Sequence, residues 1–239
     1  FLIFRIKLMN KFRLSSRLFS YAFWDGVLGY TDPNDGKREK LFQEILQLEK
    51  LRKKAEYNTG SISNSAAWCL YCIVKYFKTK NIMEIGTFIG KSSWSMAKAQ
   101  DDLYLENGYL VTCDLSNDII IPWIGKTKFK QYKKKSSTDM LKNETINPDL
   151  VLLDGRIHKD DLINFEKLIS KNTIVLLDDF EGIEKGTVNY MSLKKLEKLK
   201  THFLIYPCER STLQKVGNFS HSTLAVMLPS HLIELVAQG

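Results

Sequence analysis

The stretch that decides the fold is residues 81–92, Asn-Ile-Met-Glu-Ile-Gly-Thr-Phe-Ile-Gly-Lys-Ser. It begins as an apolar run that carries one carboxylate, Glu84, and continues with two glycines, Gly86 and Gly90, that bracket three larger residues. Glycine permits tight turns and lets a ligand approach the backbone closely. The pattern therefore predicts a strand over 81–85, a ligand-binding turn, and a helix over 91–100.

Strands and helices are expected to alternate through the rest of the chain. Continuous apolar runs at 149–154 and 173–178 are typical of strands that are buried on both faces. Further strands are expected at 109–114, 202–206 and 223–228, with a lysine-rich strand at 127–135, and helices at 63–78, 138–143, 159–170 and 187–200. This order predicts an α/β fold with a doubly wound, Rossmann-like, mostly parallel sheet. We expect this sheet to have seven strands, the last of them antiparallel.

An N-terminal helical extension, residues 1–56, is expected to precede the main domain at 57–239. Leucine and isoleucine at helical spacing, among them Leu41 and Ile45, predict a helix at about 37–56. The apolar stripe of this helix needs a partner. We therefore expect the helix to pack beside the active-site face, as part of a substrate lid or a homodimer contact.

The bulk composition is that of an ordinary globular protein, with 239 residues, 44% hydrophobic and 26% charged. The formal net charge of +8 is compatible with a protein that binds nucleic acid. The lysine run at 126–135 also suits an edge strand, where lysines prevent unwanted strand pairing. No apolar run approaches the roughly 20 residues that span a bilayer, and we expect no signal peptide. The four cysteines fit a reducing, cytoplasmic location, and Cys69 and Cys72 are expected to pack as small apolar side chains.

The glycine turn favours a nucleoside that lacks a pyrophosphate. A dinucleotide site needs G-x-G-x-x-G, and Phe88 stands where that motif has its second glycine. Asp114 ends the next strand, where a carboxylate can accept hydrogen bonds from both ribose hydroxyls. The alternative is a tight turn followed by an ordinary surface acid.

Three carboxylates end two strands that are expected to be neighbours, Asp154 in the first and Asp178 and Asp179 in the second. Adjacent strands lie about 5 Å apart, so these acids can converge. Converging carboxylates repel one another unless a proton or a cation lies between them, and oxygen ligands suit a hard divalent ion such as Mg²⁺. The alternative is that they cap helices or merely end strands.

The segment 84–92 resembles the first motif of class I S-adenosylmethionine-dependent methyltransferases. The most similar branch contains the catechol, caffeoyl-CoA and macrolide-sugar O-methyltransferases, and the resemblance covers about residues 57–229. It implies that Glu84 and Gly86 line the methionine end of the cofactor and that Asp114 binds its ribose. The other cofactor contacts that it implies are Gly60, Ser61, Thr87, Gly90, Ser92, Ser137 and Asp154.

In the metal-dependent members of that branch, a divalent metal is bound at the positions of Asp154, Asp178 and Asp179. The metal in turn binds two neighbouring oxygens of the substrate. The pair Asp178-Asp179 is more similar to the sugar-modifying enzymes, because the catechol type has Asp-Asn there.

The sequence departs from the family at the base. Ile157 stands in place of the lysine of the catechol type, and Arg156 in place of the acid of the sugar branch. His158, followed by Lys159, is the candidate base, because histidine exchanges protons near neutral pH. Alternatively, Arg156 binds an anionic group of the substrate.

The expected function is therefore divalent-metal-dependent O-methylation of a small hydroxylated molecule, such as a sugar or a vicinal diol. Two alternatives stay open, a nucleic-acid methyltransferase and a cofactor-binding protein without catalysis. The sequence contains no tetrapeptide similar to Asn-Pro-Pro-Tyr, which speaks against base methylation. The three retained acids speak against a protein that only binds the cofactor.

Overall fold

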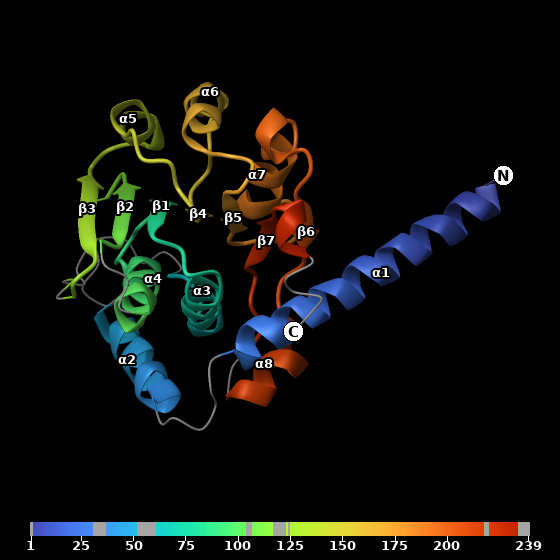
Figure 1. Cartoon of the computed structure of the whole chain (residues 1–239), viewed down its shortest axis with the longest axis horizontal. Coiled ribbons are helices and arrows are strands. Elements are labelled where there is room, and N and C mark those ends of the chain that lie inside the picture. Colours follow the sequence, from blue (N-terminus) through green and yellow to red (C-terminus); the bar gives the residue numbers. More distant parts are fainter. Residues whose placement is uncertain are drawn as a thin grey trace.

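The computed structural model describes residues 2–30, 37–51, 61–103, 107–116, 123, 125–217 and 220–233. A seven-stranded sheet with the order β3-β2-β1-β4-β5-β7-β6 forms its centre (Figure 1). The strands are β1 (Asn81–Ile85), β2 (Tyr109–Asp114), β3 (Lys128–Lys133), β4 (Leu150–Leu153), β5 (Ile174–Leu177), β6 (Phe203–Ile205) and β7 (Ala225–Leu228). All neighbouring strands are parallel except β7, which runs antiparallel to β5 and β6. The predicted sheet is confirmed.

Helices cover both faces of this sheet. They are α1 (Leu2–Gly29), α2 (Lys37–Leu51), α3 (Asn64–Phe77), α4 (Lys91–Asp102), α5 (Ser137–Asn143), α6 (Lys159–Leu168), α7 (Lys185–Leu193) and α8 (Arg210–Val216), with 3-10 turns at Glu197–Leu199 and Ser230–Leu232. The helices α3 and α4 cover one face, and α5, α6 and α7 cover the other (Figure 1). The helix α3 begins as predicted, because the Ser63 hydroxyl accepts a 3.0 Å hydrogen bond from the amide of Ala66.

Alternate side chains of the central strands enter two apolar cores, as the period of a β-strand requires. From β1, Ile82 belongs to the core beneath α3 and α4, whereas Met83 belongs to the core beneath α5, α6 and α7. Every residue of β4 and β5 is buried, as their continuous apolar runs predicted.

The lysine-rich strand β3 lies at one edge of the sheet. Its lysines are exposed, which fits the protection of an edge strand against unwanted pairing. The two aromatic residues of this strand are engaged within the protein. Phe129 packs against the core on the α3 side, and the Tyr132 hydroxyl donates a 2.6 Å hydrogen bond to Oε1 of Glu144. They are therefore not free platforms for stacking bases.

One predicted helix differs from the observed structure. The sequence predicted a single helix over 187–200, but α7 ends at Leu193 and a separate 3-10 turn follows. The chain leaves the helical conformation at Leu196, where ψ is 138°. The end of α6 stabilises this break, since the Lys198 ammonium donates hydrogen bonds to the carbonyls of Glu166 and Ile169 at 2.6 Å and 2.9 Å.

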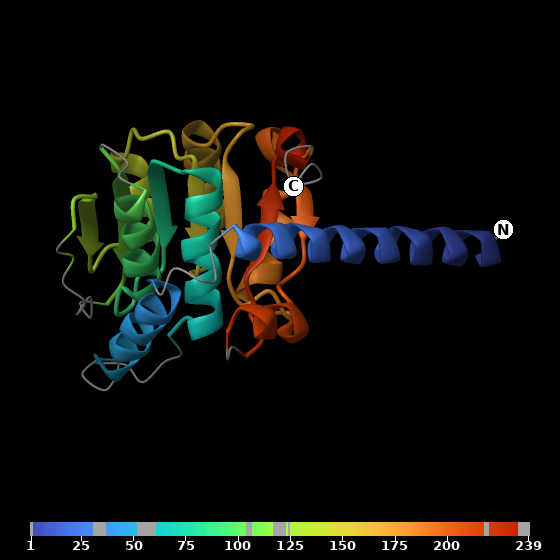
Figure 2. The same cartoon turned by 60° about the horizontal axis from the view of Figure 1, so that its bottom comes forward.

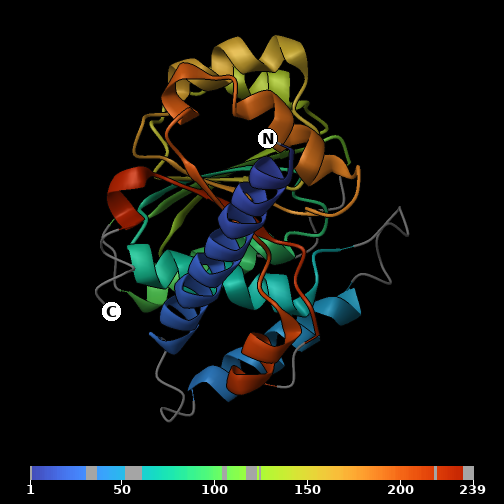
Figure 3. The ribbon, with the colours of Figure 1, turned by 90° about the vertical axis from the view of Figure 1, so that its right-hand side faces the viewer.

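Two helices, α1 and α8, were not predicted. The C-terminal part of α1 packs on α3, β6 and α8, and the helix lies in front of the sheet in Figure 3. Its N-terminal part extends away from the body (Figure 2). Among residues 16–29 of this helix, the buried side chains are Ser20, Phe23, Trp24, Val27 and Leu28. These positions have helical spacing, so the signal was present in the sequence. No helix among the described residues is long and apolar enough to cross a membrane.

The helix α2 forms an outer layer on α3 and α4 (Figure 1). It ends at Leu51, and residues 52–56 of the predicted helix lie outside the described residues, as does the predicted domain boundary after residue 56. Leu41 and Ile45 are buried within the same chain. The apolar stripe therefore has an internal partner, and a lid or dimer role for α2 stays a prediction.

Candidate active site

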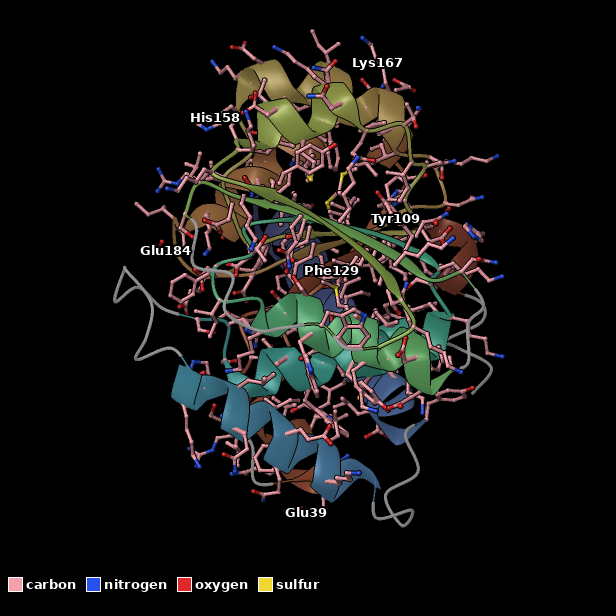
Figure 4. The ribbon with its side chains drawn as sticks, turned by 90° about the vertical axis from the view of Figure 1, so that its left-hand side faces the viewer. Glu39, Tyr109, Phe129, His158, Lys167 and Glu184 are labelled. Atoms are coloured by element: carbon pink, nitrogen blue, oxygen red, sulfur yellow. The ribbon has the colours of Figure 1, made fainter. Side chains whose placement is uncertain are left out.

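A cavity of about 700 Å³ lies at the carboxyl ends of β1, β2, β4 and β5. This is the edge where ligands bind in doubly wound sheets, and the volume falls within the roughly 300–1,000 Å³ of small-molecule sites. His158 and Glu184 lie at this edge in Figure 4, whereas Tyr109, at the start of β2, lies toward the other.

The glycine turn after β1 is built against the exit of β4. Gly86 has φ +97°, and a Cβ there would lie 2.7 Å from the amide nitrogen of Gly155. Phe88 also has a positive φ, 46°, which is costly for a bulky residue. Its amide donates a 2.7 Å hydrogen bond to Oδ2 of Asp114. The carboxylate at the end of β2 therefore holds the turn in place.

Asp114 lines the cavity, as its predicted role requires. Its Oδ1 accepts a 2.7 Å hydrogen bond from the amide of Ser116, and its Oδ2 accepts the bond from Phe88. Each carboxylate oxygen has a further lone pair. The side chain is thus fixed from behind and can accept hydrogen bonds from two neighbouring hydroxyls of a ligand.

Four other residues of the motif do not line the cavity. They are Glu84, Thr87, Gly90 and Ser92. The Glu84 carboxylate is fully buried and accepts hydrogen bonds from Ser92, Ser93 and Thr112, the last at 2.6 Å. Burial raises the pKa of this carboxyl, although the three hydroxyls oppose the shift. Glu84 joins β1, β2 and α4 behind the turn, and its contact with the cofactor stays a prediction.

Ser137 lines the cavity at the start of α5. Its hydroxyl donates a 2.7 Å hydrogen bond to Oδ2 of Asp161, and the same oxygen accepts a 3.2 Å bond from the amide of His158. Asp161, which the sequence did not single out, therefore ties the predicted adenine side of the cavity to the loop of the candidate base. Ser61 is half-buried and does not line the cavity, and Gly60 lies outside the described residues.

Asp154, Asp178 and Asp179, hereafter the acid trio, converge as predicted. One carboxylate oxygen from each lies within 4.8 Å of the others, and no other such group occurs among the described residues. Asp154 and Asp179 line the cavity, while Asp178 is buried and accepts a 3.0 Å hydrogen bond from the Thr223 hydroxyl. Burial and the neighbouring Asp178 raise the pKa of Asp154, which reflects the repulsion between these acids.

A lysine that the sequence analysis did not consider contacts this trio. The Lys185 ammonium, at the start of α7, lies 2.5 Å from Oδ1 of Asp154 and 3.1 Å from Oδ2 of Asp179. Burial lowers the pKa of Lys185, but these two carboxylates outweigh it and raise the pKa above its ordinary value. The sequence carries no signal that separates this lysine from the many on the surface.

The next turn of α7 supports the loop after β4. Asn189 is fully buried, donates a 2.9 Å hydrogen bond to the carbonyl of Gly155, and accepts a 3.1 Å bond from the amide of Ile157. Gly186 lets the helix approach closely, since a Cβ there would lie 2.2 Å from the carbonyl oxygen of Asp178. α7 thus fixes the backbone between the acid trio and the candidate base.

Two of the three basic residues at positions 156–159 line the cavity. Arg156 and His158 do so and are exposed, whereas Lys159 begins α6 and is exposed away from the lining. Lys135, which was not predicted, also contributes to the cavity wall. The cavity contains one thiol, Cys113, and burial raises its pKa to about 12, so it is neutral at physiological pH.

The family model described as O-methyltransferase matches residues 35–170, more than half of the chain. The chain belongs to this family. The predicted S-adenosylmethionine-dependent methyltransferase is thereby confirmed. No curated protein matches the sequence.

Solved O-methyltransferases share the fold at low sequence identity. TomG from Streptomyces achromogenes, an O-methyltransferase involved in tomaymycin synthesis and solved with S-adenosylmethionine, is 17% identical, with a TM-score of 0.56 over 77% of this chain and 88% of TomG. An O-methyltransferase from Bacillus cereus, solved with S-adenosylhomocysteine, is 16% identical, with a TM-score of 0.53 over 78% of this chain and 90% of that one. At these identities the likeness establishes the fold.

Proposed function

We propose that this O-methyltransferase transfers the methyl group of S-adenosylmethionine to a hydroxyl of a small molecule, such as a sugar or a vicinal diol, with the help of a divalent cation. One observation carries the proposal. A single cavity joins Asp114, at the exit of β2, to Asp154 and Asp179 of the acid trio, at the exits of β4 and β5. The proposed nucleoside site and the proposed cation site, in which carboxylate oxygens are the ligands, therefore open into the same cavity.

The residues on the β1 and β2 side suit the cofactor. Asp114 is positioned to accept hydrogen bonds from the ribose hydroxyls, and Ser137 lies where the adenine side is expected. Because Gly86 has no side chain, the turn can lie close to the backbone of Asp154. This close approach leaves space for the methionine end of the cofactor. The cofactor-bound state in which TomG was solved supports this assignment.

The acid trio fits a hard divalent cation by its chemistry. Its three carboxylates would hold the ion, and their oxygens lie within 4.8 Å of one another. When bound, the ion supplies positive charge that makes a nearby substrate hydroxyl easier to deprotonate. The protein chain itself brings the hydroxyl and the methyl group into line, which is the main requirement because the sulfonium is already a good methyl donor.

His158 is the proposed acceptor of the proton. It lines the cavity on the loop after Asp154, and its backbone is held by Asp161. In the proposed reaction, the methyl group passes from the sulfonium sulfur to the substrate oxygen. The hydroxyl proton moves to the imidazole, and S-adenosylhomocysteine leaves. Arg156, on the same wall, is available for an anionic group of the substrate.

The test is a methyl-transfer assay from isotope-labelled cofactor over a library of sugars, catechols and other vicinal diols. We expect a labelled product with Mg²⁺, loss of turnover with a chelator, and recovery when Mg²⁺ is added back. Asp178→Asn should lower turnover, whereas Asp160→Asn, an exposed acid outside the cavity, should not. Failure to bind S-adenosylhomocysteine, or tighter binding of NAD, would overturn the cofactor assignment. Turnover that resists the chelator would overturn the metal.

A further inference from the structure

The acid trio already contains a positive charge from the protein itself. The Lys185 ammonium contacts Asp154 at 2.5 Å and Asp179 at 3.1 Å, and these are the two acids of the trio that face the cavity. Two of the three carboxylates that would receive an incoming cation are therefore the ones that this lysine contacts. Lys185 is not part of the sequence pattern that predicts the metal, which consists of the three acids alone.

The position of Lys185 in its helix is an unusual one for a cation. It is the first residue of α7, where the helix dipole disfavours positive charge. The two nearby carboxylates offset that cost. The backbone has little freedom to withdraw, since Gly186 packs against the carbonyl of Asp178 and Asn189 is bonded to Gly155.

An ammonium and a divalent ion compete for these two carboxylates. Each ammonium hydrogen bond uses a lone pair that could bind the metal, and the two positive charges would repel each other at a few ångströms. Side-chain rotation can move the lysine aside, because its flexible stem reaches the partly exposed cavity wall. Cation binding at the trio is then an exchange of one charge for another.

We propose that Lys185 is the resident cation of the acid trio and that a divalent ion binds there only by displacing it. The inference rests on the divalent cation of the proposed function and adds a determinant of its affinity. In the wild-type protein the lysine weakens metal binding, so the metal acts only at concentrations that overcome this competition. Removal of the ammonium leaves the three carboxylates to the metal alone.

The experiment is a calorimetric titration of the 239-residue chain with Mn²⁺, without substrate, in wild type and in Lys185→Met. We expect the variant to bind Mn²⁺ at least about tenfold more tightly, because the competing charge is gone. Lys194→Met is the matched control, since it removes one exposed positive charge from the C-terminal end of the same helix, and it should bind as wild type does. Lys185→Arg keeps the charge and should retain the weak binding.

Adding Asp178→Asn to Lys185→Met should abolish most of the gain, which places the bound Mn²⁺ at the trio. Equal or weaker Mn²⁺ binding by Lys185→Met, in a variant that keeps its thermal unfolding transition, would overturn the inference. If Lys185→Met does not fold, Lys185→Gln replaces it under the same criteria. Turnover is not measured, so absence of any methyl-accepting substrate would count against the proposed function and leave this result standing.

Discussion

The ammonium of Lys91 lies 2.6 Å from Oε2 of Glu49 and joins the first residue of α4 to α2, the second helix of the N-terminal extension. Lys91 is 2% exposed and also donates a 2.8 Å hydrogen bond to the carbonyl of Ile62. It directly follows Gly90, the last residue of the glycine turn. The ion pair therefore connects the N-terminal extension to the helix that supports the cofactor turn.

Glu49→Gln should destabilise the protein by about 2 kcal/mol, because a buried ammonium loses its carboxylate. We place the value below that of a fully buried pair because the Glu49 side chain is 34% exposed. Urea unfolding followed by circular dichroism measures the effect. Glu39→Gln, on the exposed start of the same helix, is the control and should change stability little (Figure 4). Equal stability of the two variants would show that the pair does not hold α2.

Asp114→Ala should weaken binding of S-adenosylhomocysteine by about 10- to 100-fold, because charge-assisted hydrogen bonds to a ligand contribute about 1.5–3 kcal/mol. Calorimetry measures the affinity. Asp149→Ala is a demanding control, since Asp149 also accepts two backbone hydrogen bonds, from Lys80 and Asn81, but at the opposite end of β1. It should lower stability and leave affinity unchanged. Similar loss of affinity in both variants would reduce the role of Asp114 to general stability.

The sequence predicted the parts of the site that depend on strand ends. Continuous apolar runs located β4 and β5, and parallel neighbours place their carboxyl ends together. Convergence of Asp154 with Asp178 and Asp179 followed from that alone.

Lys185 and Asn189 could not be predicted in the same way. Their roles depend on where α7 begins and how closely it approaches β5, and the sequence pattern placed that helix at 187–200. The close approach at Gly186 decides both contacts, and it follows from tertiary packing. By contrast, α1 was predictable, because Phe23, Trp24 and Val27 recur at helical spacing.

Glu84 should make the stability of the protein depend on pH. Burial raises the pKa of its carboxyl above the ordinary value of 4.5, so the folded state binds more protons than the unfolded chain in the range above that value. Stability from this group is therefore lost as the pH rises from 4.5 toward the folded pKa. In Glu84→Gln this dependence should vanish. Unfolding free energies of both proteins across this range test it, and a difference between them that does not change with pH would contradict it.

Asn189→Ala should loosen the loop that follows the acid trio. The substitution leaves the carbonyl of Gly155 and the amide of Ile157 without their side-chain partner, which costs about 1–3 kcal/mol for buried groups. Turnover should fall more than cofactor affinity, because this loop carries His158 and Arg156, whereas Asp114 lies at the end of β2. The same measurements on Ser192→Ala, on the same helix, provide the control. A loss of cofactor affinity as large as the loss of turnover would refute a role in positioning the loop.

The two candidate bases can be separated because only one lines the cavity. His158→Gln removes the imidazole on the cavity wall and should lower kcat by at least about 100-fold, the lower range for general-base catalysis, with little effect on cofactor affinity. Lys159→Gln removes a charge from the next residue, outside the lining, and should leave kcat within about threefold of wild type. If Lys159→Gln reduced kcat as strongly as His158→Gln, the base would not be His158 alone. If neither did, deprotonation would depend on the acid trio and its cation.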